Sequence, residues 1–264
     1  MSSPTPAKPQ RVLLRRPRAD PAARLFCFPY SGVGASMYNR WPAFAGPAEI
    51  CLVQPPGREN RIKEPHYGTY EQLAEQLADQ LLPYFDRPFG FFGHCGGALP
   101  GFALASLLWE RGLPTPDRLF LSSQVSPHDG PFGRFLELTN AELANELTAF
   151  VGKLGGNLSP DMIAMGLRVL RKDVDANKAY HLDTPVKLPT TIHAIGWSDD
   201  VEIRPEQSTG WAEYTEPGRF RQVVLEGEHH AFLHAPPALL DELGSGMAAA
   251  VEGRHAFAGS GGVA

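Results

Sequence analysis

The chain has 264 residues, 43% of them hydrophobic and 20% charged, and its formal net charge at neutral pH is −5. This composition is ordinary for a soluble globular enzyme, and the length suffices for one large α/β domain spanning residues 1–264. The acidic balance, without a long basic run, argues against nucleic acid as a partner. No stretch is apolar enough for a signal peptide or a membrane span, and three cysteines without metal-ligand spacing favour the reducing cytoplasm.

The predicted elements alternate between strands and helices along most of the chain. Strands are expected at residues 24–28, 50–53, 87–92, 118–123, 190–195 and 219–225, and helices at 69–85 and 98–109. This alternation predicts a mostly parallel central sheet with helices on both faces. The two ends, at about 1–9 and 256–264, are expected to be disordered because of their composition.

One helical segment interrupts the alternation between the strands at 118–123 and 190–195. It is predicted to hold helices at 141–151 and 161–180, with Gly155-Gly156 and Pro160 between them. Long insertions in compact domains tend to be functional, so we predict a lid over the site at about residues 135–185. Packing helices outside the site are the alternative.

The pentapeptide Gly93-His94-Cys95-Gly96-Gly97 follows the G-x-S-x-G nucleophile-elbow pattern, with a thiol in place of the serine hydroxyl. An apolar strand precedes it and an Ala/Leu-rich helix follows, which is the context that an elbow needs. At the start of that helix the dipole favours a thiolate. Cys95 is therefore the predicted nucleophile, and a small buried cysteine in a tight turn is the alternative.

Candidates for the acid and the base follow Cys95 in the chain order of α/β-hydrolases. Asp199 and Asp200 come directly after a predicted strand, at the sheet edge where open α/β sheets place their chemistry. His229 and His230 follow the last strand, on a loop that leads into a helix. A thiol needs a base to take its proton, and the base needs an acid to orient it, so one residue of each pair is the predicted partner of Cys95.

Two backbone amides are expected to form an oxyanion hole. One belongs to Gly96, the residue after the nucleophile, and the other to the glycine-containing loop at 29–34, where Ser31 is the candidate. A phosphate-binding interpretation of Gly32 and Gly34 lacks the third glycine and the downstream acid of a dinucleotide fingerprint. No metal site is predicted.

In combination, these motifs resemble those of type II (editing) thioesterases, which serve polyketide synthases and nonribosomal peptide synthetases. The resemblance runs along almost the whole chain. The motifs are specific for this family in combination, whereas each short motif alone is not. The matching residues are Leu25-Phe26-Cys27-Phe28-Pro29-Tyr30-Ser31-Gly32, Val53-Gln54-Pro55-Pro56-Gly57-Arg58-Glu59-Asn60-Arg61, Phe92-Gly93-His94-Cys95-Gly96-Gly97-Ala98, Leu170-Arg171-Lys172-Asp173, Tyr180, Asp199-Asp200, Trp211 and Gly227-Glu228-His229.

The resemblance implies an α/β-hydrolase fold with a helical lid. It also implies a monomeric enzyme that acts on acyl groups carried by the 4′-phosphopantetheine arm of an acyl or peptidyl carrier protein, with no cofactor of its own. The family's spacing to a following aliphatic residue selects Asp200, and its Gly-x-His frame selects His229. The competing His-x-Phe-Leu frame selects His230, so the implied triad is Cys95, His229 and Asp200, with Asp199 and His230 as second choices.

The family's nucleophile is almost always serine, so the thiol of Cys95 is a departure. An acyl group that moves from pantetheine to Cys95 remains a thioester, which reacts readily with thiols and amines. One alternative function is therefore an acyltransferase or aminoacyltransferase that passes the acyl group through Cys95 to another carrier protein or an amine. A hydrolase of free esters and a non-catalytic binding protein are further alternatives. Hydrolysis through an acyl-enzyme stays the first choice, because the rest of the chain resembles hydrolases.

Overall fold

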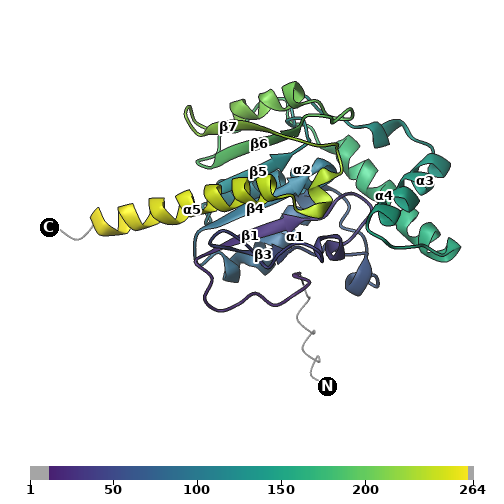
Figure 1. Ribbon diagram of the computed structural model, residues 1–264, viewed down its shortest axis with the longest axis horizontal. Coiled ribbons are helices and arrows are strands. Elements are labelled where there is room, and N and C mark those ends of the chain that lie inside the picture. Colours follow the sequence, from purple (N-terminus) through teal and green to yellow (C-terminus); the bar gives the residue numbers. More distant parts are fainter. Residues whose placement is uncertain (1–11, 261–264) are drawn as a thin grey trace, which may run out of the picture.

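A seven-stranded sheet forms the centre of the computed structural model, which describes residues 12–260 (Figure 1). The strands are β1 Ala23–Phe28, β2 Phe44–Ala45, β3 Ala48–Leu52, β4 Phe89–His94, β5 Arg118–Ser122, β6 Thr191–Trp197 and β7 Phe220–Leu225. Their order across the sheet is β2-β3-β1-β4-β5-β6-β7. Every neighbouring pair is parallel except β2 with β3, so the carboxyl ends of the parallel strands share one edge.

Helices cover both faces of this sheet. Side chains alternate along each strand, so Phe26 of β1 packs on one face and its neighbour Leu25 on the other. Helices α1 (Tyr70–Leu81) and α2 (Ala98–Glu110) cover the face of Phe26, and α5 (Pro237–Ser260) covers that of Leu25. The predicted mostly parallel sheet between two layers of helices is confirmed.

Helix α1 shows how the sequence sets the bounds of an element. Thr69 caps its start in a capping box with Gln72, in which Gln72 N donates to Thr69 Oγ1 at 3.3 Å and Thr69 N donates to Gln72 Oε1 at 3.2 Å. The helix ends at Leu81, earlier than the predicted 85, and a 3-10 turn over Leu82–Tyr84 follows. Pro83 has no amide hydrogen to continue the α-helical ladder, which accounts for the change.

The structure also differs from the prediction at the C-terminus. Helix α5 runs through Ser260 and so includes residues 256–260 of the segment predicted to be disordered. The alanine-rich sequence before it has high helix propensity, which favours continuation of the helix. The remainder of that segment, and the predicted disordered segment at 1–9, lie outside the described residues. No helix within residues 12–260 has the length and apolar character needed to cross a bilayer.

The predicted lid segment contains two helices, α3 (Asn140–Lys153) and α4 (Pro160–Ala179). They lie together beyond one end of the strands, whereas α5 extends past the opposite end (Figure 1). The two helices pack on each other around their own apolar cluster, whose buried members are Leu136, Leu143, Leu147, Leu170 and Val174. The lid segment therefore has a small core separate from the two that flank the sheet.

Candidate active site

Cys95 lies on the tight turn between β4 and α2, where its backbone is left-handed, with φ of +50°. A Cβ atom added to Gly93 would lie 2.1 Å from the carbonyl oxygen of Gly97, and one added to Gly97 would lie 2.7 Å from that of Pro29. Real Cβ atoms do not approach oxygen so closely, so glycine is required at both positions. The turn leaves the thiol half-buried at the carboxyl edge of the sheet.

Asp200 follows β6 and is buried among hydrogen-bond donors. Its Oδ2 accepts from the Ser123 hydroxyl at 2.7 Å and lies 2.9 Å from His229 Nδ1. Its Oδ1 accepts from the amides of Glu202 and Ile203 at 2.8 and 3.0 Å. Burial raises the pKa of Asp200, but these hydrogen bonds outweigh it and lower the pKa below its ordinary value. An ionised carboxylate at this place holds the proton of His229 on Nδ1.

His229 follows β7 and lies beside the Cys95 thiol. Its Nε2 is buried and has no hydrogen-bond partner among residues 12–260, which leaves this nitrogen free for proton transfer. Burial lowers the pKa of His229, but Asp200 and Cys95 raise it more, to about 10. A histidine that holds its proton at neutral pH can pair with a thiolate, the reactive form of a cysteine.

The second member of each pair lies outside this cluster. Asp199 is exposed, and its carboxylate accepts from the Ser198 hydroxyl at 3.0 Å. His230 Nδ1 lies 3.0 Å from Lys153 Nζ on α3. Burial, together with the nearby charges of His229 and Lys153, lowers the pKa of His230 to about 4. The structure brings the first-choice acid and base together with the thiol and leaves the second choices apart.

A narrow cavity of about 20 Å³ borders the Cys95 thiol, and both predicted oxyanion donors line it. A Cβ atom added to Gly96 would lie 3.8 Å from the amide nitrogen of Ser31, so the two residues are adjacent. Amides of two adjacent residues beside the nucleophile are the donors that an oxyanion hole requires. The rest of the wall comes from the loop before α3, the end of α4 and the loop after β6, through Phe132, Gly133, Arg134, Phe135, Leu136, Val174, Asn177 and Glu202.

A larger cavity of about 530 Å³ lies between the lid helices and the loops after β1 and β3. Apolar side chains dominate its walls, among them Ile62, Leu147, Met162 and Met165. Cys95 is not among the residues that line it. The thiol therefore borders the narrow cavity and not the larger one.

Sequence reasoning missed several polar residues around this site. Ser123, which holds the acid, directly follows β5 and has φ of +46°. Arg134 pairs with Glu146 of α3 at 2.6 Å and with Glu202 at 3.3 Å, and Glu202 Oε2 lies 3.9 Å from His229 Nε2. The place of Ser123 at the carboxyl end of a predicted strand was a usable signal. Arg134 and Glu202 carried none, because no local motif predicts that the loop before α3 meets the loop after β6.

Comparisons with known proteins identify the family of the chain. The family model "Thioesterase domain" matches residues 23–245. Linear gramicidin dehydrogenase LgrE of Brevibacillus parabrevis is 32% identical over 241 residues, which cover 88% of this chain and 90% of that protein. The structure of the RedJ thioesterase from the prodiginine pathway in Streptomyces coelicolor is 32% identical, with a TM-score of 0.71, over 88% of this chain and 91% of that one. YbtT, a type II thioesterase from the yersiniabactin NRPS/PKS pathway, is 25% identical, with a TM-score of 0.75, over 91% and 98%.

The matched range covers all seven strands, from the first residue of β1 into α5, with the elbow, the acid and the base inside it. The solved thioesterase structures share the arrangement over nearly the whole of both chains. The predicted α/β-hydrolase fold and the predicted enzyme class, a thioester hydrolase, agree with both findings. The chain belongs to the thioesterase family.

Proposed function

We propose that this chain is a type II thioesterase of nonribosomal peptide or polyketide biosynthesis. Its substrate would be an acyl thioester on the phosphopantetheine arm of a carrier protein. YbtT, which it resembles in sequence and structure, is named as a type II thioesterase of an NRPS/PKS biosynthetic pathway, and RedJ as a thioesterase of the prodiginine biosynthetic pathway. The observation that carries the proposal is that the His229–Asp200 pair lies beside Cys95, and that Cys95 borders one narrow cavity together with Ser31 and Gly96.

Acylation of the enzyme is the first half of the proposed reaction. The Cys95 thiolate attacks the thioester carbonyl carbon, and the carbonyl oxygen takes up the negative charge. The amides of Ser31 and Gly96 donate to that oxyanion. As the bond from carbon to the pantetheine sulfur breaks, the His229 imidazolium gives its proton to the leaving sulfur. The acyl group then stays on Cys95 as a thioester, and His229 is neutral.

Deacylation returns the enzyme to its starting state. Neutral His229 takes a proton from a water molecule while the water oxygen attacks the acyl carbon. The same amides hold the second oxyanion, and the bond from carbon to the Cys95 sulfur breaks. The products are a carboxylic acid, the thiolate and the imidazolium. Asp200 orients the ring and stabilises its charge in both halves.

Covalent acylation of Cys95 is the direct test. After incubation with an acyl-carrier protein and an acid quench, intact-mass spectrometry should show the protein heavier by one acyl group, and peptide mapping should place it on Cys95. Burial raises the pKa of Cys51 to about 12 and also raises that of Cys27. Cys51→Ala and Cys27→Ala should therefore acylate like the wild type, whereas Cys95→Ala should not. An acyl group mapped to another residue would contradict the proposal.

The fate of the acyl group separates hydrolysis from transfer. With a second carrier protein or an amine present, we expect the wild type to release mainly free acid. None of the three relatives above is named an acyltransferase, so the transfer alternative has no support from them. The measurement is the ratio of free acid to transferred acyl group, for the wild type and for Cys95→Ser. A persistent acyl-enzyme that discharges only to the acceptor would favour the transferase.

A further inference from the structure

In the loop after β1, the backbone amide of Ser31 has no hydrogen-bond acceptor among the residues that the structure describes. Tyr30 N donates to the Met37 sulfur at 3.1 Å, and Gly32 N donates to Asp173 Oδ2 at 2.7 Å. Between them, the amide of Ser31 donates to no acceptor within residues 12–260. Buried backbone donors are normally paired, so a free amide beside a cavity is available to a ligand. This amide belongs to a residue that borders the cavity at the thiol.

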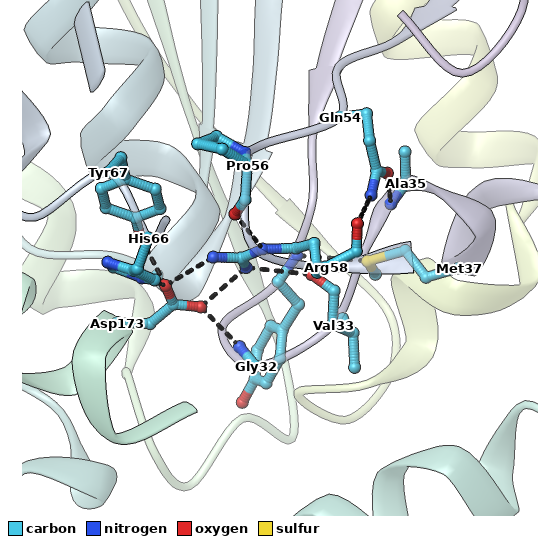
Figure 2. A network of polar contacts seen from close by, with 12 residues as sticks. Gly32, Val33, Ala35, Met37, Gln54, Pro56, Arg58, His66, Tyr67 and Asp173 are labelled. Atoms are coloured by element: carbon cyan, nitrogen blue, oxygen red, sulfur yellow. Dashed lines mark hydrogen bonds and ion pairs between the residues drawn. The ribbon is translucent and has the colours of Figure 1, made fainter. Parts of the chain in front are cut away.

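The carboxylate of Asp173, on α4, collects donors from the loops after β1 and β3 (Figure 2). Its Oδ2 accepts from Gly32 N at 2.7 Å and from Arg58 Nη1 at 2.8 Å. Its Oδ1 accepts from Arg58 Nη2 at 2.9 Å and from the Tyr67 hydroxyl at 2.6 Å, and lies 2.7 Å from His66 Nε2. These contacts join the lid segment to the loop that carries Ser31.

The Asp173–Arg58 pair is buried and charged. The two side chains are 3% and 5% exposed, respectively. Burial raises the pKa of Asp173, but the charge of Arg58 and the hydrogen bond with His66 lower it well below its usual range. The carboxylate is therefore a fixed, ionised acceptor. Because Arg58 compensates its charge at close range, Asp173 can lie near a developing oxyanion without strongly opposing it.

From this geometry we infer that Asp173 is a positioning residue for the oxyanion hole. Its bond to Gly32 N fixes the peptide group that directly follows Ser31. Arg58 Nη1 holds the same loop by donating to the carbonyl oxygen of Val33 at 3.1 Å. With these groups held, the Ser31 amide keeps one direction before substrate arrives, which is the preorganisation that an oxyanion hole needs. The inference rests on the proposed function, because it requires acyl transfer to the thiol.

Two reactions of Cys95 separate positioning from general loss of structure. Acylation by the small thioester acetyl-S-N-acetylcysteamine passes through an oxyanion. Alkylation by iodoacetamide joins the sulfur to a saturated carbon and expels iodide, so no oxyanion forms. A misplaced Ser31 amide should slow acylation alone, whereas a disturbed fold or a lost thiolate should slow both. The measured quantity is the ratio of the two rate constants.

Asp173→Asn is the most conservative variant for this test. Three donors approach Oδ1 and two approach Oδ2, so the amide oxygen should take the Oδ1 place. The NH₂ group then faces Gly32 N, from which it cannot accept. We expect acylation to slow by about 10- to 100-fold, less than the roughly 10²–10³-fold cost of deleting a donor, and alkylation to stay within about twofold. Tyr67→Phe removes a donor to Oδ1 only and should leave both rates near wild type.

A second variant covers the case in which Asp173→Asn does not fold. Arg58→Met combined with Asp173→Leu removes both buried charges together, which proteins often tolerate, and leaves Gly32 N equally without its acceptor. A selective loss of acylation in either folded variant supports the positioning role. Parallel loss of both reactions, or no loss of either, would overturn it. A wild type that is not acylated on Cys95 would refute the proposed function, and with it this inference.

Discussion

His229→Ala should lower the hydrolysis of acyl-carrier protein by about 10³-fold or more, whereas His230→Ala should keep most of the activity. His229 has Nδ1 on Asp200 and a free Nε2 beside the thiol, which are the two contacts that a base requires. His230 instead meets Lys153, and its pKa is lowered to about 4. The check is kcat/KM for both variants, with thermal unfolding to confirm that each is folded. A larger loss in His230→Ala would show that the base is the other histidine.

The pH dependence of alkylation gives a second readout of the same residue. Because the pKa of His229 is raised to about 10, its charged form is present at neutral pH and is lost only as the pH rises through that value. We expect iodoacetamide to alkylate wild-type Cys95 rapidly at pH 7. His229→Ala removes the cation beside the sulfur, which favours a thiolate, so this variant should be alkylated more slowly than the wild type at pH 7. His230→Ala should follow the wild-type profile.

Asp200→Asn should lower kcat/KM by at least about 10²-fold, and Asp199→Asn should stay close to wild type. Asparagine at this position has no negative charge to stabilise the His229 imidazolium, and its NH₂ group can face the ring in place of an acceptor oxygen. The corresponding change in a serine protease lowers kcat by about 10⁴-fold. The Asp199 side chain is exposed, and among residues 12–260 its carboxylate accepts a hydrogen bond from Ser198 alone, so Asp199→Asn should be silent.

Stability provides the control for this second pair. Asp200→Asn disturbs a buried acceptor of several hydrogen bonds and should reduce the free energy of unfolding by about 1–3 kcal/mol. A loss of that size leaves a typical domain folded, so the fall in activity can be read as chemistry. Equal activities of the two variants would contradict the assignment of the acid.

The features that sequence predicted well are those encoded by neighbouring residues. The strand before Cys95, the glycines around it and the helix after it lie within one short segment, so a local sequence pattern can predict them. Thr69 likewise predicts the start of α1, because it forms a capping box with Gln72, three positions later. The local sequence did not suffice to assign the acid and the base, because two adjacent candidates exist for each. Only the spacing of the family's motifs ranked Asp200 and His229 first.

The contacts that could not be predicted join distant parts of the chain. Gly32 and Asp173 are 141 positions apart, and Ser123 and Asp200 are 77 apart. Local propensity and periodicity carry no information about which loop meets which helix. The acceptor of Gly32 N, which fixes the loop of Ser31, lies on a helix of the lid segment and cannot be found from the loop's own sequence.

The hydrogen bond from Gly32 N to Asp173 assigns different roles to two parts of the lid segment. Helix α3 and the first half of α4 enclose the larger cavity, whereas the second half of α4 carries the carboxylate that holds the loop of Ser31. Chimeras that exchange lids between relatives should therefore join the chains ahead of Leu170. Such a junction would leave the Asp173 anchor with its own loops, while the exchanged portion could alter the shape of the cavity.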